Sequence, residues 1–317
     1  MTPAFVVGEV LTRFVRDGIL VLALIIPIRA GLGLNFAVTI GAMATQTALL
    51  FVLDRQIEGM AGLALTGALG CALAGVLGVA IGHVVNRVRG QEMIATMIMG
   101  FIGTSLYQLC FLAGYGNWWP VGNTEIALSR GVGVRSMVDL DGYRDTLTGI
   151  GRFQFFGIDV PTGMMLAVAM VALALFLLDR TRIGAHFRAV GESWEHAVLM
   201  GLDADRIRIR AMVVSTVLAA LGQLVYLENI GMLNVYTAHL NSDVFSSAAL
   251  LAGGATITRV RIRHALLGIV FFHALFIVSP QAGQNIFRNA ALGEYFRSFV
   301  AYGTIAVALI MNMRRGK

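Results

Sequence analysis

The chain has 317 residues, of which 57% are hydrophobic and only 13% charged, with a formal net charge of +6 and a mean hydropathy of +0.76. A soluble domain typically carries about 25% charged residues, so this composition excludes a water-soluble globule. The sequence predicts an all-α integral membrane protein with a single transmembrane domain over residues 1–317. The net charge does not indicate a nucleic-acid partner, because the positive residues lie between the apolar stretches.

The chain begins with residues 1–17, where charged residues are interspersed among apolar ones. We expect this segment to be an amphipathic helix on the membrane surface that leads into the first span. The apolar stretch Gly18–Ile28 is short, so we expect it to be tilted, broken, or extended by the helix before it.

The remaining apolar stretches predict transmembrane helices, because a helix needs roughly 20 mainly apolar residues to cross a bilayer. We expect about eight to ten spans in total on this criterion, with the count least certain in the first third of the chain. Six stretches are clear spans and two are further candidates. The clear spans are Gly59–Val85, Met93–Tyr115, Val160–Leu178, Ala211–Leu227, His264–Val278 and Arg297–Met311, and the candidates are Leu34–Leu53 and Ser246–Thr258.

Arginine placement predicts which loops face the cytoplasm, where short loops carry an excess of Lys and Arg. Six arginines lie in Asp179–Arg210, whereas Gly116–Asp159 mixes arginines with acidic residues. We therefore place residues 179–210 and the C-terminus in the cytoplasm, and residues 116–159 outside. Within the outer loop, Trp118 and Trp119 suit the headgroup region, or alternatively a stacking site for a ring-shaped solute.

No catalytic or cofactor-binding motif is present. The only lysine is Lys317, so the phosphate-binding pattern GxxxxGK[ST], which needs a lysine at a helix start, cannot occur. Cys71 and Cys110 lie in apolar stretches, where a thiol behaves as a small hydrophobe, and the six histidines are scattered. The chain is not expected to be an enzyme or to bind a metal, and any ATP hydrolysis must come from another polypeptide.

The predicted cytoplasmic loop contains a candidate short helix. Ser193 suits an N-cap, and Gly201 suits a helix stop because glycine takes the left-handed conformation. About two turns lie between them, with Trp194 and Ala197 on one face, and we expect Gly191 and Gly201 to be hinges on either side of this helix. The alternative is an ordinary surface turn, since short helices are marginal without tertiary contacts.

The chain resembles the permeases of ABC importers for simple sugars and nucleosides, which are related to branched-chain amino acid permeases. The run "GAHFRAVGESWEHAVLMGLDADRIRIRAMVVSTVLAALGQ" is similar to their cytoplasmic loop, and "SSAALLAGGATITRVRIRHALLGIVFFHAL" and "VRGQEMIATMIMGFIG" are similar to two further tracts. The resemblance runs from about Arg29 to the C-terminus.

The resemblance implies a bacterial inner-membrane permease with inverted repeats and broken helices. It also implies three partners in addition to the lipid bilayer: an ATP-hydrolysing subunit, a second permease chain (the same or different), and an extracytoplasmic solute-binding protein. Residues 192–201 would form the coupling helix that docks on the ATPase. The implied coupling residues are Arg188, Gly191, Glu192, Ser193, Trp194, Glu195, Ala197 and Gly201.

The implied solute is a nucleoside or a simple sugar, but the chain departs from the family pattern near the expected channel, with Thr39 at a glutamate position and Gly100 at an asparagine position. Polar span residues either contact solute or bond a neighbouring helix, and Gln223 and His273 are among these. We expect the solute path to include Asn35, Phe36, Gln46, Phe101, Thr104, Gln108, Gly253 and Gly254.

The alternative function is an autonomous secondary transporter or channel. Ion-coupled carriers usually need buried ionisable residues, and no acidic residue is placed securely at the midplane of the membrane. Glu228, at the outer end of its span, is expected to be exposed. This absence and the loop resemblance favour the ABC permease.

Overall fold

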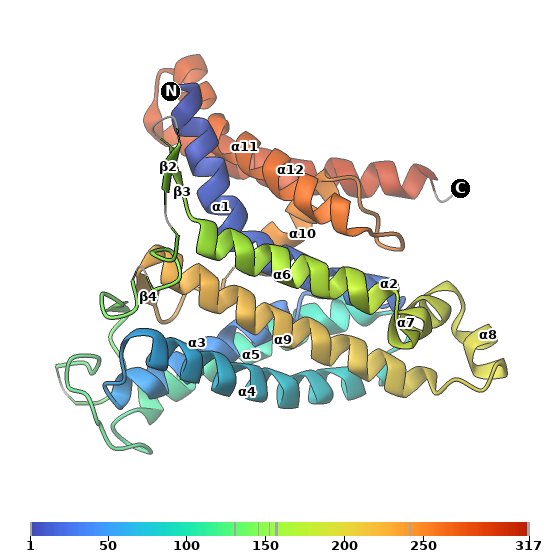
Figure 1. Ribbon diagram of the computed structural model, residues 1–317, viewed down its shortest axis with the longest axis horizontal. Helices are drawn as coiled ribbons and strands as arrows, with labels where there is room; N and C mark the ends of the chain where they lie inside the picture. The colour runs from blue at the N-terminus through green and yellow to red at the C-terminus, as the bar shows by residue number, and fades with distance from the viewer. Residues whose placement is uncertain are drawn as a thin grey trace.

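The computed structural model describes residues 2–129, 131–144, 146–151, 153–155, 158–240 and 242–315. It is a bundle of long helices that run back and forth between two ends, with short strands at one end only (Figure 1). The helices are α1 (Pro3–Ala23), α2 (Ile25–Arg29), α3 (Val38–Asp54), α4 (Gly59–Arg87), α5 (Glu92–Leu109) with the π-helical turn η1 (Cys110–Gly114), α6 (Thr162–Asp179), α7 (Arg182–Glu192), α8 (Trp194–Leu199), α9 (Ala204–Ile230), α10 (Ser242–Ala252), α11 (Ile262–Phe287) and α12 (Ala290–Arg315).

Among the described residues, five helical segments are long and apolar enough to cross a membrane, and each contains or nearly matches one of the six clear spans predicted from the sequence. They are α4, α5 with η1, α6, α9 and α11; α3 and α10 are shorter apolar helices. The prediction of an all-α integral membrane protein is confirmed. The sixth clear span lies inside α12, which is not among these five.

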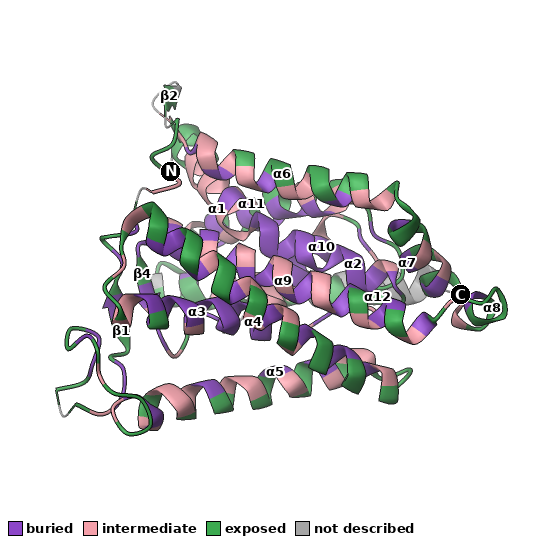
Figure 2. Cartoon of the chain, turned by 60° about the horizontal axis from the view of Figure 1, so that its bottom comes forward, coloured by how far each residue is buried: buried purple, intermediate pink, exposed green. Residues whose placement is uncertain are grey.

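Burial differs sharply between the helices. The window of α9 that could span the membrane is 61% buried, whereas those of α5 with η1 and of α6 are each 17% buried. Figure 2 shows α5 and α6 as mostly exposed helices on opposite sides of the buried centre. Lipid or another chain must therefore cover most of the apolar surface of α5 and α6.

The first helix matches one of the predicted alternatives, in which the helix of residues 1–17 extends into the apolar stretch that follows it. Helix α1 starts at an N-cap made by Thr2 and runs without a break to Ala23. Its second half is buried against α9 and α11. Pairing explains how the charges of α1 can enter the bundle: Asp17 lies 3.1 Å from His273 of α11, and 3.6 Å from Arg16.

The chain then breaks inside the bundle. After α2, residues 30–37 turn back toward α9, where the side chain of Asn35 donates to Ser215 and accepts from the backbone of Ala37. Helix α3 starts there. This is the broken helix that the resemblance implied, whereas the inverted repeat stays a prediction.

Two end points also differ from the predicted spans. The candidate span Ser246–Thr258 is instead α10, which ends at Ala252 because a turn follows at Gly254, where φ is +87°. Helix α9 begins at Ala204, ahead of the predicted Ala211, with Asp203 as its N-cap.

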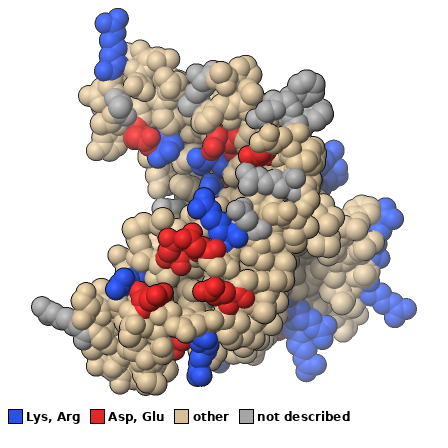
Figure 3. Space-filling model, turned by 60° about the vertical axis from the view of Figure 1, so that its left-hand side comes forward, with Lys and Arg blue, Asp and Glu red and all other residues tan. Residues whose placement is uncertain are grey.

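The loops that the sequence assigns to opposite sides of the membrane lie at opposite ends of the bundle (Figure 1). The strand end carries the loop 116–159, with β1 (Met137–Asp139) paired to β4 (Met232–Asn234), and β2 (Phe153–Phe155) paired to β3 (Ile158–Val160). Acidic and basic side chains are intermixed on this end (Figure 3). The loop 179–210 lies at the other end.

Carboxylates fasten the outer loop to the bundle. Asp54 accepts hydrogen bonds from the backbone N–H groups of Gly122 and Asn123. Glu228 accepts from the backbone of Leu147 and Thr148 and is 2% exposed, so the prediction of an exposed Glu228 is wrong. Backbone donors replace the water that a surface carboxylate would bind.

A tyrosine adds a neutral contact in the same loop. The Tyr143 hydroxyl donates to the carbonyl of Ile57. Burial, with Glu58 nearby, raises the pKa of Tyr143 to about 12. The hydroxyl therefore remains a donor across the physiological pH range. The exposed rings of Trp118 and Trp119 meet edge to face at this end, and both interpretations of the pair stay predictions.

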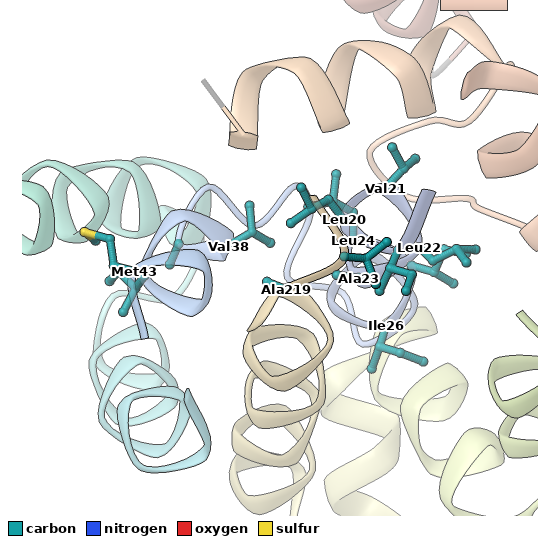
Figure 4. Close-up of a cluster of buried hydrophobic side chains, with 14 of the residues drawn as sticks. Leu20, Val21, Leu22, Ala23, Leu24, Ile26, Val38, Met43 and Ala219 are labelled. Atoms are coloured by element: carbon teal, nitrogen blue, oxygen red, sulfur yellow. The ribbon is translucent and has the colours of Figure 1, made fainter. Parts of the chain in front are cut away.

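Helix α9 is the centre of the core. Figure 4 shows the side chains of Leu20, Ala23 and Leu24 gathered beside Ala219 of α9. Helix α4 packs on another side of α9, where Gly78 and Gly82 face it, while Gly70 faces Thr45 of α3. These glycines belong to a buried stripe of small residues at four-residue spacing: Gly62, Thr66, Gly70, Ala74, Gly78 and Gly82. Small residues let two helix backbones approach closely, which drives helix association in lipid.

The closeness of α4 and α9 gives a first prediction. A Cβ atom on Gly78 would overlap the Thr216 hydroxyl and lie 2.8 Å from Val213 Cα, whereas one on Gly75 would meet only Val217, at 4.0 Å. We expect Gly78→Ala to destabilise the purified protein by about 1–3 kcal/mol through overpacking. Thermal unfolding in detergent measures this, and Gly75→Ala is the matched control. Equal melting temperatures for the two variants would contradict the packing described here.

Candidate functional site

The predicted cytoplasmic loop is almost entirely helical. Thr181 caps α7 by accepting from Gly184 N, and Ser193 both ends α7 and caps α8 by accepting from His196 N. Gly201, with φ +79°, follows α8. The short helix is therefore present and the surface-turn alternative is wrong, but α7 itself was not expected as a helix.

Gly191 is not a hinge. It lies inside α7, and its φ is not in the left-handed region, which Gly201 does occupy. A Cβ at Gly191 would overlap the carbonyl oxygen of Arg29, and one on Gly31 would lie 3.0 Å from Gly191 Cα. Glycine is required because the backbone of α7 touches the backbone after α2.

An ion-pair cluster fixes the same junction. Asp179, at the end of α6, lies 2.9 Å from a guanidinium nitrogen of Arg29 and also pairs with Arg188 of α7. Asp179 therefore forms ion pairs with both the end of α2 and α7. Arg188 was predicted from the sequence, whereas Arg29 and Asp179 were not, because these two residues lie far apart in the chain.

A cavity of about 360 Å³ separates α8 from the base of α5 and α9. The Arg89 guanidinium lies 4.0 Å from the centre of the Trp194 ring and 2.8 Å from the Asp205 carboxylate. Arg208 pairs with Glu92 across the same cavity, and both are largely buried. Arginine stacked on tryptophan is a favourable cation–π contact, so α8 is positioned by charges from two other parts of the chain.

Glu195 and His196 are exposed in the first half of α8, and the end of the helix presents apolar residues. Ala197 faces the bundle and is fully buried, whereas Leu199 is 83% exposed and Met200 67% exposed. Three successive residues from Val198 to Met200 are exposed hydrophobics. Such a patch on a charged end of the molecule is typical of a protein-binding surface.

The residues predicted for the solute path do not form one cluster. Asn35 and Gln46 are buried near α9, with Gln46 Oε1 3.0 Å from His239 Nδ1. Phe101 is 65% exposed on the outside of α5, together with the partly exposed Thr104. These two do not face the buried pair.

The remaining path residues have other contacts. Phe36 N donates to Thr96, and the Gln108 amide donates to the carbonyl of Tyr236. Gly253 packs on α11, where a Cβ would overlap His264 O, and Gly254 forms the turn after α10. Both glycines therefore have structural reasons that the sequence did not reveal, and a solute-path role for these residues stays a prediction.

One acidic residue of α1 packs against a helix that could span the membrane. Asp17 is half-buried, with Oδ2 3.1 Å from Nε2 of His273, which is near the middle of α11. The expectation that no acidic residue lies at the membrane midplane stays a prediction.

A bundle of apolar helices with a short, exposed helix held at one end defines a multi-pass permease of the transporter class. The chain belongs to the family described as the branched-chain amino acid transport system permease component, whose model matches residues 6–309. The resemblance to ABC-importer permeases is thereby confirmed.

Curated relatives are similar to part of the chain. The autoinducer 2 import system permease protein LsrC of Klebsiella pneumoniae is 27% identical over 175 residues, which is 55% of this chain and 48% of the relative. The probable ABC transporter permease protein YphD of Escherichia coli is 26% identical over 206 residues, 64% of this chain and 57% of the relative. The ribose import permease protein RbsC of Haemophilus influenzae is 24% identical over 170 residues, 53% of this chain and 49% of the relative. These matches span about half the length of each relative, and no solved structure matches the chain.

The buried pair at the base of α8 gives a second prediction. Arg208→Met leaves Glu92 buried without its partner, which costs about 3–5 kcal/mol. The double variant Arg208→Met with Glu92→Met removes both charges and should be the more stable of the two. Thermal unfolding of the purified chain decides this. A double variant that melts below Arg208→Met would show that the pair is not coupled.

Proposed function

We propose that this chain is the membrane subunit of an ATP-driven importer for a sugar-type solute in a bacterial inner membrane. One observation carries the proposal: α8 presents exposed apolar residues at the end of a segment that is fastened to α2, α6 and α9. A separate ATPase subunit would bind that surface. The helices would then respond as rigid bodies to closure of the ATPase.

The names of the relatives support the solute class. Relatives are named as import permeases for autoinducer 2, fructose and ribose. A sugar-type solute is therefore our proposal for this chain, and the nucleoside implied by the resemblance stays a prediction. A second permease chain and an extracytoplasmic binding protein complete the proposed complex.

Docking through α8 gives a third prediction. We expect Leu199→Asp to weaken co-purification with the ATPase subunit by roughly tenfold or more, because burying one leucine contributes about 1.5–3 kcal/mol. Leu128→Asp, which changes an exposed leucine at the opposite end, is the matched control. Both variants should fold, since both side chains are exposed.

Uptake provides the second readout. Deletion of Ser193–Met200 should abolish ATP-dependent uptake while the protein still inserts into the membrane. Uptake that survives this deletion would refute the ABC assignment and favour the autonomous carrier.

The orientation gives a fourth prediction, with residues 116–159 outside and residues 179–210 and the C-terminus in the cytoplasm. Thr124 and Glu192 are exposed at opposite ends. In a variant with Cys71→Ala and Cys110→Ala, an impermeant thiol reagent should label Thr124→Cys in intact cells, and Glu192→Cys only after permeabilisation. The reverse pattern would invert the topology.

A further inference from the structure

The most unusual polar contact in the bundle is the Asp17–His273 pair that joins α1 to α11. Asp17 Oδ2 lies 3.1 Å from His273 Nε2 and 3.6 Å from a guanidinium nitrogen of Arg16. Arg16 also lies over the ring of Tyr226 on α9. A charge in a span is costly and usually marks a functional site. Neither the coupling segment nor the predicted solute path makes use of this pair.

The pair lines a cavity of about 70 Å³ between α1, α9, α10 and α11. Its polar lining consists of Asp17, Gln223, Tyr226, Ser242, Ser246 and His273. Asp17 and His273 join α1 to α11 at the wall of this cavity.

Two atoms in this lining have hydrogen-bonding capacity that the described residues do not use. Gln223 is fully buried and its Nε2 lies 3.4 Å from the carbonyl oxygen of Ala238, but its Oε1 accepts no hydrogen bond. His273 is 4% exposed, and its Nδ1 has no hydrogen-bond partner either. A buried polar atom left in this state costs about 1–3 kcal/mol. Both atoms belong to residues that line the same cavity.

The charged residues at the cavity determine which class of ligand it can bind. Asp17 disfavours an anion, and Arg16 beside it offsets the attraction for a cation. The remaining groups are a mixture of acceptors and hydroxyl donors, with Tyr226 and Phe245 as aromatic walls. That combination suits a ligand that is uncharged, with hydroxyl groups that both donate and accept.

The volume of the cavity indicates which molecules it can hold in this conformation. A water needs about 10–15 Å³ of such space, whereas pockets for small organic ligands usually measure about 300–1,000 Å³. The cavity therefore holds a few waters in this conformation but no complete sugar.

We propose that this cavity is the closed form of a binding site for a neutral hydroxylated solute, in which Gln223 and His273 bond the hydroxyl groups and Ser246 forms part of the wall. The inference rests on the proposed import function and identifies where its solute binds. It moves the solute site from the predicted residues on α3 and α5 to the space between α1 and α11.

Thiol labelling tests the site even while the solute is unidentified. In purified full-length chain carrying Cys71→Ala and Cys110→Ala, Ser246→Cys should react with methyl methanethiosulfonate. Ser247→Cys is the matched control, because Ser247 is its neighbour on α10 and is 2% exposed, but does not line the cavity. We expect Ser246→Cys to react about tenfold faster or more, since thiol reactivity depends on access. Equal rates would overturn the proposal.

Protection identifies the ligand class. Labelling of Ser246→Cys is repeated with ribose, fructose, glucose and ribitol, and separately with leucine and valine. Slower labelling with one of the neutral sugars or polyols supports the proposal. Protection by the amino acids alone, or by none of these probes, would overturn it and leave the cavity as a hydrated space.

Gln223→Leu provides the final check. This variant removes the free acceptor at similar volume, so the protecting sugar should be needed at about tenfold higher concentration, while the rate without sugar changes little. Unchanged protection would contradict a direct role of Gln223. The ATPase-binding test at Leu199 is independent of these results, so the import function and this site can fail separately.

Discussion

The close packing of α4 and α9 is the constraint on which the rest of the structure depends. In lipid the hydrophobic effect does not hold helices together, so backbone proximity and interhelical hydrogen bonds must do so. The stripe of small residues on α4 brings Thr216 Oγ1 within 3.0 Å of the carbonyl of Ala74. On another side, Ser215 donates to the carbonyl of Ala23 and accepts from Asn35. One turn of α9 thus positions α1, α3 and α4 together.

The positions of the charged residues also depend on whether water or lipid surrounds them. At the two ends of the bundle, charged residues form exposed ion pairs or accept hydrogen bonds from the backbone of loops, as Asp54 and Glu228 do. Inside the bundle, Asp17 is tolerated because Arg16 and His273 replace its hydration. A charge on the apolar faces of α5 or α6 would have no such partner among the described residues.

Much of the fold was predictable because it depends on local signals. Runs of apolar residues located the long spans, and Ser193 and Gly201 marked the ends of α8. What failed depended on distant partners. The contact between α1 and α11 could not be predicted because His273, which lies 3.1 Å from Asp17, is near the other end of the chain. Gly191 looked like a hinge because the carbonyl of Arg29, the real reason for a glycine, cannot be found by reading the loop alone.

The contact between Gly31 and Gly191 has a mechanical consequence. Gly31 begins the segment that enters the bundle and ends at Asn35. Gly191 lies one residue before the end of α7, which is the arm that carries α8. With no side chain between them, there is no compressible layer to absorb a displacement. Force applied to the arm therefore reaches the interior of the bundle through main chain alone, over the few residues from Gly31 to Asn35. Transmission by this route is stiff and short, and it bypasses the whole length of α6.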